Sequence, residues 1–445
     1  MSIDKAPGQS SGNSSDTSAG TTQPGRRRFL QTAAAGASAL WLPSTTRAAA
    51  SLRFQPAVFE PGTNSAMLWM AVDGAASVLI ELSATETFAN ARRIPVTDVT
   101  AASEHVGAQR IDGLEPDRTF YYRILDADSG APISRPGRFR TAPAQPRPFR
   151  FAWSADMDEA YQPFRLFDRI GERDPEFFLH LGDSIYADLP RNQFSPSPSF
   201  YRRKHANNRR DSHFQQFMLR HATFATWDDH ETDNNAHAGH PHMAAARQVY
   251  REYWPCNSVA ADGLYRRVSW AGVDFFMLDL RSYRSPQNDP PGPQKTMLGA
   301  AQKQWFLQAL SASQAPFKFV VTSVPFQGGG EDTWFSYRAE RDEISALIRK
   351  QKIGGVIFLT GDYHLARDWS NPKAAFREFM AGPIASFTHY RNTPSARDRY
   401  EKTGTFHYGD GYNFGLVSVD PATGKARVEF VDAEGKVLGA VDFTA

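Results

Sequence analysis

The chain contains a single cysteine, Cys256, among its 445 residues. One thiol excludes an intrachain disulfide framework and any metal site built from several cysteines, so we expect Cys256 to pack as an ordinary small side chain. The chain also lacks an excess of one charge, because 50 Lys and Arg residues are balanced by 48 Asp and Glu residues. A balanced charge gives no general attraction to nucleic acids or anionic membranes, and we infer no nucleic-acid partner.

No hydrophobic run is long enough to span a bilayer. The nearest candidate is the Ala-rich segment 32–42, which follows Arg26-Arg27-Arg28 and precedes an Ala-rich stretch ending at Ala50. Twin arginines, a weakly apolar segment and small residues at its end are typical of a Tat export signal. We therefore predict that residues 1–50 form a disordered leader and Tat signal cleaved near Ala50; a membrane anchor or a plain disordered tail are the alternatives.

This signal predicts a periplasmic or secreted protein that uses the Tat export machinery and keeps no stable membrane anchor after cleavage. The Tat route carries folded proteins, many of which load a cofactor before export. The signal is therefore a first indication of a bound metal.

Residues 51–142 have the pattern of a small β-sandwich. Short strand-like runs such as 67–72 and 119–124 are separated by turn residues such as Asp73-Gly74, and regular short strands with turn signals are typical of sandwiches. No group of ionisable residues with ligand spacing occurs here, so we expect a scaffold or lid domain. The Pro-rich segment 143–148 is the expected linker.

Strand-like and helix-like segments alternate in residues 149–445, which predicts a layered α/β domain with a mixed sheet. The main expected strands are 149–153, 177–181, 222–227, 273–280, 317–324 and 356–360, and the main expected helices are 163–172, 243–253, 299–310 and 341–350.

Several of these expected strands end in carboxylates. Asp156 follows the first, Asp183 follows Gly182 after the second, and Asp362 and His364 follow the strand at 356–360. The strand at 222–227 is followed by the cluster Asp228–Asn235. One such aspartate is usually a helix cap, but several buried carboxylates would repel one another unless cations neutralised them. Oxygen and imidazole ligands suit Ca²⁺, Mn²⁺ or iron.

Two further features are expected to support the site. Asp279 also ends a strand, and we expect it to pair with Arg281 or Arg284. Gly328-Gly329-Gly330 lacks the Lys-Ser/Thr of a P-loop and is interpreted as a loop near the site.

The chain contains five segments in a fixed order: Gly182-Asp-Ser-Ile-Tyr186, Trp227–Asn235, Leu278–Arg284, Leu298–Leu307 and Gly361-Asp-Tyr-His364. Together they resemble the motif series of the alkaline phosphatase D family, within the calcineurin-like metallophosphatase superfamily. The resemblance implies a calcineurin-like catalytic domain of layered mixed sheets and helices over 149–445. Before it, the resemblance implies a fibronectin III-like or purple-acid-phosphatase-N-like sandwich.

The resemblance also implies roles for individual residues. Asp183 would bridge two metal ions, and the family's tyrosinate ligand to ferric iron falls on Tyr186. His230 would protonate or hydrogen-bond the leaving oxygen, and Asp183 takes part in catalysis as the shared ligand. The full expected ligand set is Asp156, Tyr186 and His364 on one side of Asp183 and Asp362, Asp229 and Asn234 on the other, with Asn235 as the alternative to Asn234.

One difference from the family's motif pattern affects which metals the chain is expected to bind. Family members that hold iron through a cysteine have it at the end of the first catalytic strand, where this chain has no cysteine and Asp156 is the candidate ligand. The resemblance implies Ca²⁺ and Fe³⁺, and the missing thiolate makes Mn²⁺ or Zn²⁺ acceptable at the first site.

The resulting hypothesis is an exported, metal-dependent phosphoric ester hydrolase (EC 3.1) acting on small-molecule phosphate monoesters and diesters at alkaline pH through a metal-activated water. A nucleic acid enters this hypothesis only as a phosphodiester substrate. Phospholipase D-like or phosphotriesterase activity at the same site is a second hypothesis. A third is a non-catalytic periplasmic binding protein that uses the sandwich domain for glycans or protein partners.

Overall fold

The computed structural model describes residues 49–74, 76–369, 375–403 and 405–445. Ala48–Ala445 form one compact unit. The expected Tat signal lies outside the described residues apart from Ala49 and Ala50, so it stays a prediction. Within the described ranges, no helix combines the length and the apolar character needed to cross a bilayer.

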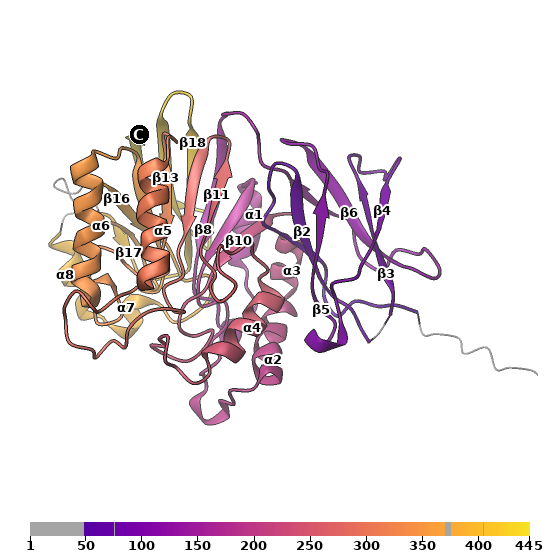
Figure 1. The fold of residues 1–445 in the computed structure, drawn as a ribbon, viewed down its shortest axis with the longest axis horizontal. Helices are drawn as coiled ribbons and strands as arrows, with labels where there is room; N and C mark the ends of the chain where they lie inside the picture. Colours follow the sequence, from indigo (N-terminus) through magenta and orange to yellow (C-terminus); the bar gives the residue numbers. More distant parts are fainter. Residues whose placement is uncertain (1–48, 75, 370–374, 404) are drawn as a thin grey trace, which may run out of the picture. The chain divides into compact units, whose positions relative to one another are not determined.

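An N-terminal β domain comes first, as the sequence predicts (Figure 1). Four of its strands form an antiparallel sheet in the order β4-β3-β6-β7, and β1, β2 and β5 pair with one another in a second sheet. Alternate residues such as Leu68, Ile80 and Ile124 fill the core between the sheets. The strands are β1 (Ala57–Phe59), β2 (Ser65–Ala71), β3 (Val78–Ser83), β4 (Arg92–Pro95), β5 (Val106–Asp112), β6 (Thr119–Asp126) and β7 (Gly137–Arg140).

The α/β domain that follows contributes two mixed sheets. One has the order β20-β19-β18-β8-β9-β10 and continues into β1-β2-β5, and the other has the order β11-β12-β13-β14-β16-β15-β17. Its strands are β8 (Phe149–Ser154), β9 (Phe177–Leu181), β10 (Ala222–Thr226), β11 (Arg266–Trp270), β12 (Val273–Met277), β13 (Lys318–Val321), β14 (Val356–Thr360), β15 (Ala366–Asp368), β16 (Arg377–Met380), β17 (His407–Tyr408), β18 (Asn413–Asp420), β19 (Lys425–Asp432) and β20 (Val437–Thr444).

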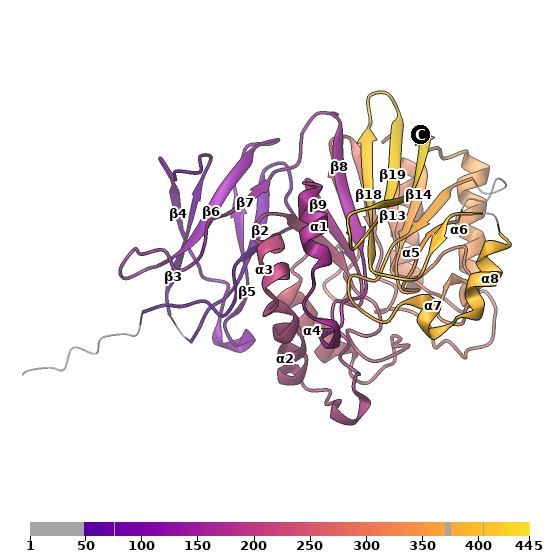
Figure 2. The same cartoon turned by 180° about the vertical axis from the view of Figure 1, so that it is seen from behind.

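Helices cover the outer faces of these sheets, so that the domain has helix, sheet, sheet and helix layers (Figures 1 and 2). Helices α1, α3 and α4 pack on the sheet of β8–β10, and α5 and α6 pack on the sheet of β12–β14. The α-helices are α1 (Leu166–Glu172), α2 (Pro198–Arg209), α3 (Ser212–Met218), α4 (Met243–Tyr253), α5 (Gly299–Ala312), α6 (Arg338–Gln351), α7 (His389–Asn392) and α8 (Ser395–Glu401).

The residue pattern of β9 explains why both of its faces are buried. Phe177 and Leu179 point into the core between the two sheets, whereas Phe178 points into the core under the helices. The ring of Phe177 stacks on Phe151 of β8 at 5.2 Å between centroids, and the Phe151 ring contacts Phe275 of the other sheet at 5.1 Å. A strand that is covered on both faces is apolar along its whole length. Residues 177–181 show this pattern in the sequence.

The two predicted domains share a sheet, which the sequence does not indicate. β1 lies parallel to β10, with Phe59 opposite Thr223. The buried hydroxyl of Tyr122 also donates to the carbonyl oxygen of Leu219 at 3.1 Å. The backbone therefore ties the β domain to the strand that leads to the site.

Parallel pairing then sets the position of the site. β8, β9 and β10 run in the same direction, with Ser154 and Ala225 both opposite His180. β12, β13, β14 and β16 are likewise parallel. The carboxyl ends of parallel strands lie at one edge of a sheet, where α/β proteins build ligand sites.

Candidate metal centre

Four strand ends carry the candidate ligands into one buried cluster. Asp156 follows β8, Asp183 follows β9, Asp228 and Asp229 follow β10, and Asp362 follows β14. Asp156, Asp183, Asp228 and Asp229 are at most 3% exposed, and Asp362 is half-buried with its Oδ2 atom buried. The structure therefore brings together the strand-end carboxylates that the sequence singles out.

The backbone at these positions has left-handed dihedrals. The φ angles are 66° at Asp156, 52° at Asp183, 71° at Asp362 and 53° at His364. Residues other than glycine rarely adopt such angles, and strain of about 1–3 kcal/mol each persists chiefly where function requires it. Four such residues in one cluster support a functional role for it.

Two glycines make room for the carboxylates. Gly182 has φ of 100°, and a Cβ there would lie 2.6 Å from Cβ of Asp228. Gly382 has φ of 148°, and a Cβ there would lie 2.6 Å from Oδ2 of Asp156. No larger residue fits at either position without moving the cluster.

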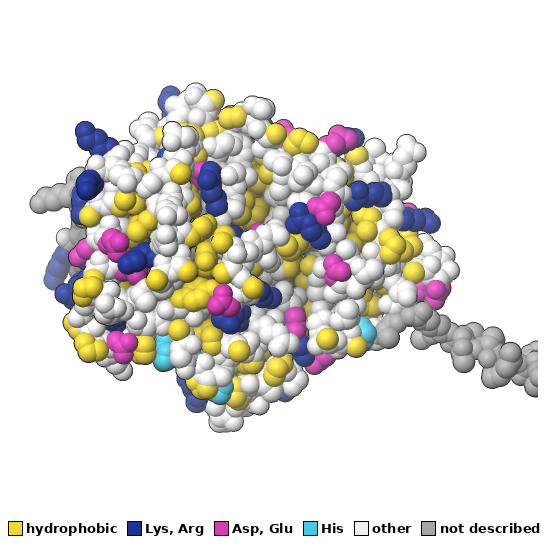
Figure 3. Space-filling model, in the orientation of Figure 1, with side chains coloured by type: hydrophobic (Ala, Val, Ile, Leu, Met, Phe, Trp, Pro, Cys, Tyr) yellow, Lys and Arg dark blue, Asp and Glu magenta, His cyan; other side chains and the backbone are white. Residues whose placement is uncertain are grey.

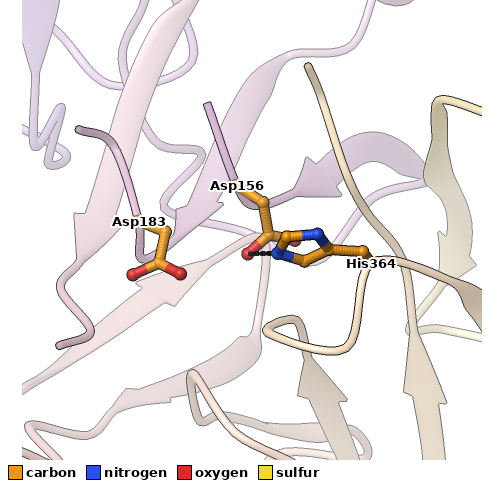
Figure 4. Close-up of side chains that lie close together, drawn as sticks. All are labelled: Asp156, Asp183 and His364. Carbon is orange, nitrogen blue, oxygen red and sulfur yellow. Dashed lines mark ion pairs between the residues drawn. The ribbon is translucent and has the colours of Figure 1, made fainter. Parts of the chain in front are cut away.

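Asp183 is the shared corner of this cluster. It belongs to three of the four groups of acidic and histidine side chains whose ligand atoms lie within 4.8 Å of one another. Figure 4 shows one of them, in which Nε2 of His364 lies 3.7 Å from Oδ1 of Asp156, with Asp183 beside them. The groups are Asp156, Asp183 and His364; Asp183, Asp229 and His230; Asp183, Asp228 and Asp362; and Asp228, Asp229 and Asp332.

The charges of the cluster are not balanced internally. Both carboxylate oxygens of Asp156, and Oδ2 of Asp228 and of Asp362, are buried without a well-formed hydrogen bond among the described residues. Burial and then the neighbouring carboxylates raise the pKa of Asp156, Asp183 and Asp362 well above the usual range. Buried oxygens that lack donors and repel one another fit a divalent or trivalent cation.

His364 is prepared to act as a ligand. Its Nδ1 lies 2.6 Å from the carbonyl oxygen of Phe387 and donates to it, which leaves the Nε2 lone pair facing Asp156. Burial lowers the pKa of His364 to about 3, so the ring is neutral. A carbonyl that fixes the tautomer of an imidazole is typical of metal-ligating histidines. The phenol oxygen of Tyr186 lies 2.9 Å from the same Nε2.

His230 lies on the other side of Tyr186, with 4.2 Å between the ring centroids. Its Nδ1 is 2.6 Å from Oδ1 of Asp188. Burial opposes a charge on this imidazole, but the carboxylates of Asp229 and Asp188 outweigh it and raise the pKa of His230 to about 9. His230 is predicted from the sequence as a site residue, but nothing in the sequence indicates that Asp188 is its partner.

Asp229 differs from the other candidate ligands. Burial disfavours its charge, but Arg281, His230 and the backbone N–H of Asn235 lower the pKa of Asp229 below its usual range. The Asn235 N–H donates to Oδ2 of Asp229 at 2.6 Å. Asn234 is exposed, whereas Asn235 is half-buried.

Glu231 holds together the loops around the metal centre, a role that is not predicted from the sequence. Its carboxylate accepts the backbone N–H groups of Ser184 at 2.6 Å, Asp228 at 2.9 Å and Asp183 at 3.0 Å. It therefore joins the ends of β9 and β10. Its place in the segment Trp227–Asn235 marks it as part of a motif, but only the fold shows which amides it reaches.

The expected ion pair of Asp279 is wrong. Asp279 accepts from the indole N–H of Trp227 at 2.7 Å and from several backbone N–H groups. The guanidinium of Arg281 instead bonds Asp228 and Asp332, each at 2.7 Å, and Arg284 also bonds Asp332. Asp279 thus supports the structure through Trp227, and Arg281 neutralises part of the carboxylate cluster.

These layers and this cluster define an α/β metallophosphatase fold preceded by a β domain. Residues 151–430 match the family described as PhoD-like phosphatase, and residues 42–143 match its N-terminal domain. The chain belongs to the PhoD-like phosphatase family.

Individual relatives agree with this assignment. The chain is 29% identical over 319 residues to alkaline phosphatase D of Bacillus subtilis (strain 168), a match that covers 59% of this chain and 53% of that protein. An 84-residue match to purple acid phosphatase 23 of Arabidopsis thaliana is 33% identical and covers 18% of each chain. The chain thus spans about half the length of the first relative and less of the second.

Two solved structures share the fold. The structure of PhoD aligns with a TM-score of 0.76 at 21% identity, covering 89% of this chain and 90% of that one. The purple acid phosphatase PPD1 from yellow lupin (Lupinus luteus) seeds aligns with a TM-score of 0.61 at 13% identity, covering 87% and 74%.

Proposed function

We propose that the chain is an exported metal-dependent phosphoric ester hydrolase that acts on phosphate monoesters and diesters. The observation that carries the proposal is the convergence on Asp183 of buried carboxylates, several of whose oxygens have no hydrogen-bond partner among the described residues, in a chain of the PhoD-like phosphatase family. The names of the relatives, alkaline phosphatase D and purple acid phosphatase, support the same class of reaction.

The residues present fit two cations that share Asp183. Asp156, Tyr186 and His364 would hold one, and Asp362, Asp229 and an asparagine would hold the other, with Asn235 favoured over the exposed Asn234. Asp228 is a further candidate for the second ion, because its Oδ2 is buried without a partner among the described residues. When bound, the cations would neutralise these carboxylates, activate a water and bind the phosphoryl oxygens.

The metals are proposed to be Fe³⁺ and Ca²⁺. Tyr186 supports ferric iron, and the oxygen-rich second group supports Ca²⁺. Asp156 in place of a thiolate hardens the first site, so Mn²⁺ and Zn²⁺ are the alternatives there.

The protein's own groups supply the proton transfers and the orientation. His230, held by Asp188, would donate a proton or hydrogen bond to the leaving oxygen. Arg281 and Glu231 hold the strand-end loops in place through Asp228 and the amides beside it. The closed, buried setting strengthens each of these interactions.

Export through the Tat pathway to the periplasm or beyond the cell is part of the proposal. Its support is the sequence Arg26-Arg27-Arg28 and the segment up to Ala50. A fusion of residues 1–50 to a folded reporter tests it, with Arg26, Arg27 and Arg28 changed to Lys as the control. Export that does not depend on these arginines would contradict it.

The activity is tested with p-nitrophenyl phosphate and bis-p-nitrophenyl phosphate, before and after chelation and after adding back single metals. We expect hydrolysis of both, loss on chelation, and recovery with the correct metal. No hydrolysis by metal-loaded protein, with phosphate esters merely bound, would favour the binding-protein hypothesis. Hydrolysis of lipid diesters or triesters alone would favour the phospholipase D-like or phosphotriesterase hypothesis.

A further inference from the structure

A pocket of about 570 Å³ opens beside the metal centre and belongs to none of the candidate metal-binding groups. Its walls come from the turn after β8, the segment between β16 and α7, and the residues before β18. β18 runs antiparallel to β8, so its beginning lies at the same sheet edge as Asp156. The pocket and the centre therefore lie at the same edge of the fold.

Residues 386–388 form a wall shared by the pocket and the centre. Ser386 and Phe387 line the pocket. On the side of the centre, the carbonyl oxygen of Phe387 accepts from His364, and the ring of Phe387 lies 4.1 Å from the His364 ring. A substrate held at the centre would thus lie one chain segment away from the pocket.

Some polar groups in the wall of the pocket are already paired. Arg397 forms an ion pair with Asp410 and lies 4.5 Å over the ring of Tyr390. The hydroxyl of Tyr390 bonds His407. Asp410 and Glu434 also line the pocket, so an anion would be favoured only beside a cation that has no acidic partner.

Three further side chains of the wall have free polar groups. Tyr161 and Tyr412 are half-buried and pack on the hydrophobic core, and Arg391 is exposed. Among the described residues, none of the three has a side-chain hydrogen bond or ion pair. All three line the same pocket.

We propose that this pocket binds the second organic group of a phosphodiester whose phosphorus is held at the metal centre. That group would contain a planar ring that packs on Tyr161 and Tyr412 and an anionic substituent that pairs with Arg391. Aromatic rings gain about 0.5–1.5 kcal/mol from such packing beyond the area they bury, and a guanidinium pairs strongly with carboxylate or phosphate. This inference rests on the proposed function and specifies its substrate.

The test uses metal-loaded protein and three p-nitrophenyl phosphodiesters whose second group is methyl, phenyl or carboxyphenyl. The leaving group is the same in all three, so differences in kcat/KM report the second group. We expect kcat/KM to rise about tenfold from methyl to phenyl, and again from phenyl to carboxyphenyl.

Variants assign these gains to residues. Tyr412→Ala should remove most of the phenyl gain and leave the methyl ester within about twofold, and Tyr412→Phe should restore it because the ring is retained. Arg391→Ala should remove only the gain from the carboxylate, and Arg399→Ala, an exposed arginine on α8, should change neither.

Three results would overturn the inference, in distinguishable ways. Equal loss on the methyl and phenyl esters in Tyr412→Ala would show that Tyr412 supports the fold and not the second group. Equal kcat/KM for all three esters in the unmodified protein would show that no such subsite exists, although the proposed hydrolysis would stand. Absence of hydrolysis of all three would contradict the proposed function and this inference together.

Discussion

The phenol oxygen of Tyr186 lies 2.9 Å from Nε2 of His364, although the two residues are 178 positions apart in the chain. The contact joins the end of β9 to the end of β14, and thus one strand from each sheet. Both side chains are buried, and His364 also faces Asp156. A phenol oxygen, an imidazole nitrogen and a carboxylate, which are all possible metal ligands, therefore meet beside Asp183.

Tyr186→Phe should abolish any tyrosinate bond to ferric iron, because it removes the only oxygen of this side chain. In iron-loaded protein we expect the loss of a visible tyrosinate-to-iron absorption band and a lower iron content. Tyr201→Phe is the matched control, since its buried hydroxyl donates to the carbonyl oxygen of Thr232 at 3.0 Å. A band that persists in Tyr186→Phe would remove Tyr186 from the ligand set.

His230→Ala should slow hydrolysis of alkyl phosphate esters more than that of p-nitrophenyl esters. A good leaving group needs no proton, whereas general acid catalysis contributes about 10²–10⁴-fold for a poor one. Asp188→Asn should have the same pattern with a smaller effect, because it weakens the partner of His230. His213→Ala, which removes a surface pair with Asp168, is the control. Equal loss on both classes of ester would argue against proton donation by His230.

Glu231→Gln should lower both the free energy of unfolding and the retention of metal. One carboxylate oxygen is replaced by an NH₂ group that cannot accept from the strand-end amides, at a cost of about 1–3 kcal/mol. Glu340→Gln is the matched control, because Glu340 also accepts two backbone N–H groups, from Met297 and Leu298, outside the candidate metal groups. Thermal unfolding and metal content together check this. Equal metal loss in both variants would contradict a specific role for Glu231.

Glu378 should make the stability depend on pH. Burial raises its pKa to about 7, although the backbone N–H groups of Phe326 and Gln327 favour its charged form. Because the folded state holds this proton above the unfolded pKa of 4.5, the free energy of unfolding should fall as pH rises from about 4.5 to 7, by roughly 3 kcal/mol. In Glu378→Gln this contribution is absent, so the two proteins should diverge in that window. Parallel unfolding curves across it would contradict the assignment.

Strand ends could be located from the sequence because the strands are buried on both faces. Phe177–Leu181 is apolar throughout and is followed at once by Gly182-Asp183, so the polar residues stand out. Parallel strands then bring such ends together. Asp156, Asp183, Asp362 and His364 do lie in one cluster.

Long-range partners could not be derived in the same way. Arg281 reaches Asp228 and Asp332 instead of Asp279, because the choice depends on the direction of its side chain after β12. Asp188 and Glu231 bond groups about 40 to 50 positions away or on neighbouring loops. The pairing of β1 with β10 is likewise set by packing between the domains.

Basic and acidic side chains are interspersed on the face shown in Figure 3, in keeping with the nearly balanced composition. Substrate binding by this family member is therefore expected to depend on local groups such as the metal centre and Arg391. Rates on small phosphate esters should change little with moderate ionic strength. A steep fall in kcat/KM between low and physiological salt would contradict this.

The most direct test of the account is the metal content of the chain with and without Asp183. We expect about two ions per chain in the folded, active protein, since two-metal sites share such a bridging ligand, and less than one in Asp183→Ala, with activity lost. Asp174→Ala is the matched control, because Asp174 is also an aspartate with positive φ, of 46°, but lies outside the candidate metal groups. Full metal content and full activity in Asp183→Ala would contradict the central claim that Asp183 is the shared corner of two metal sites.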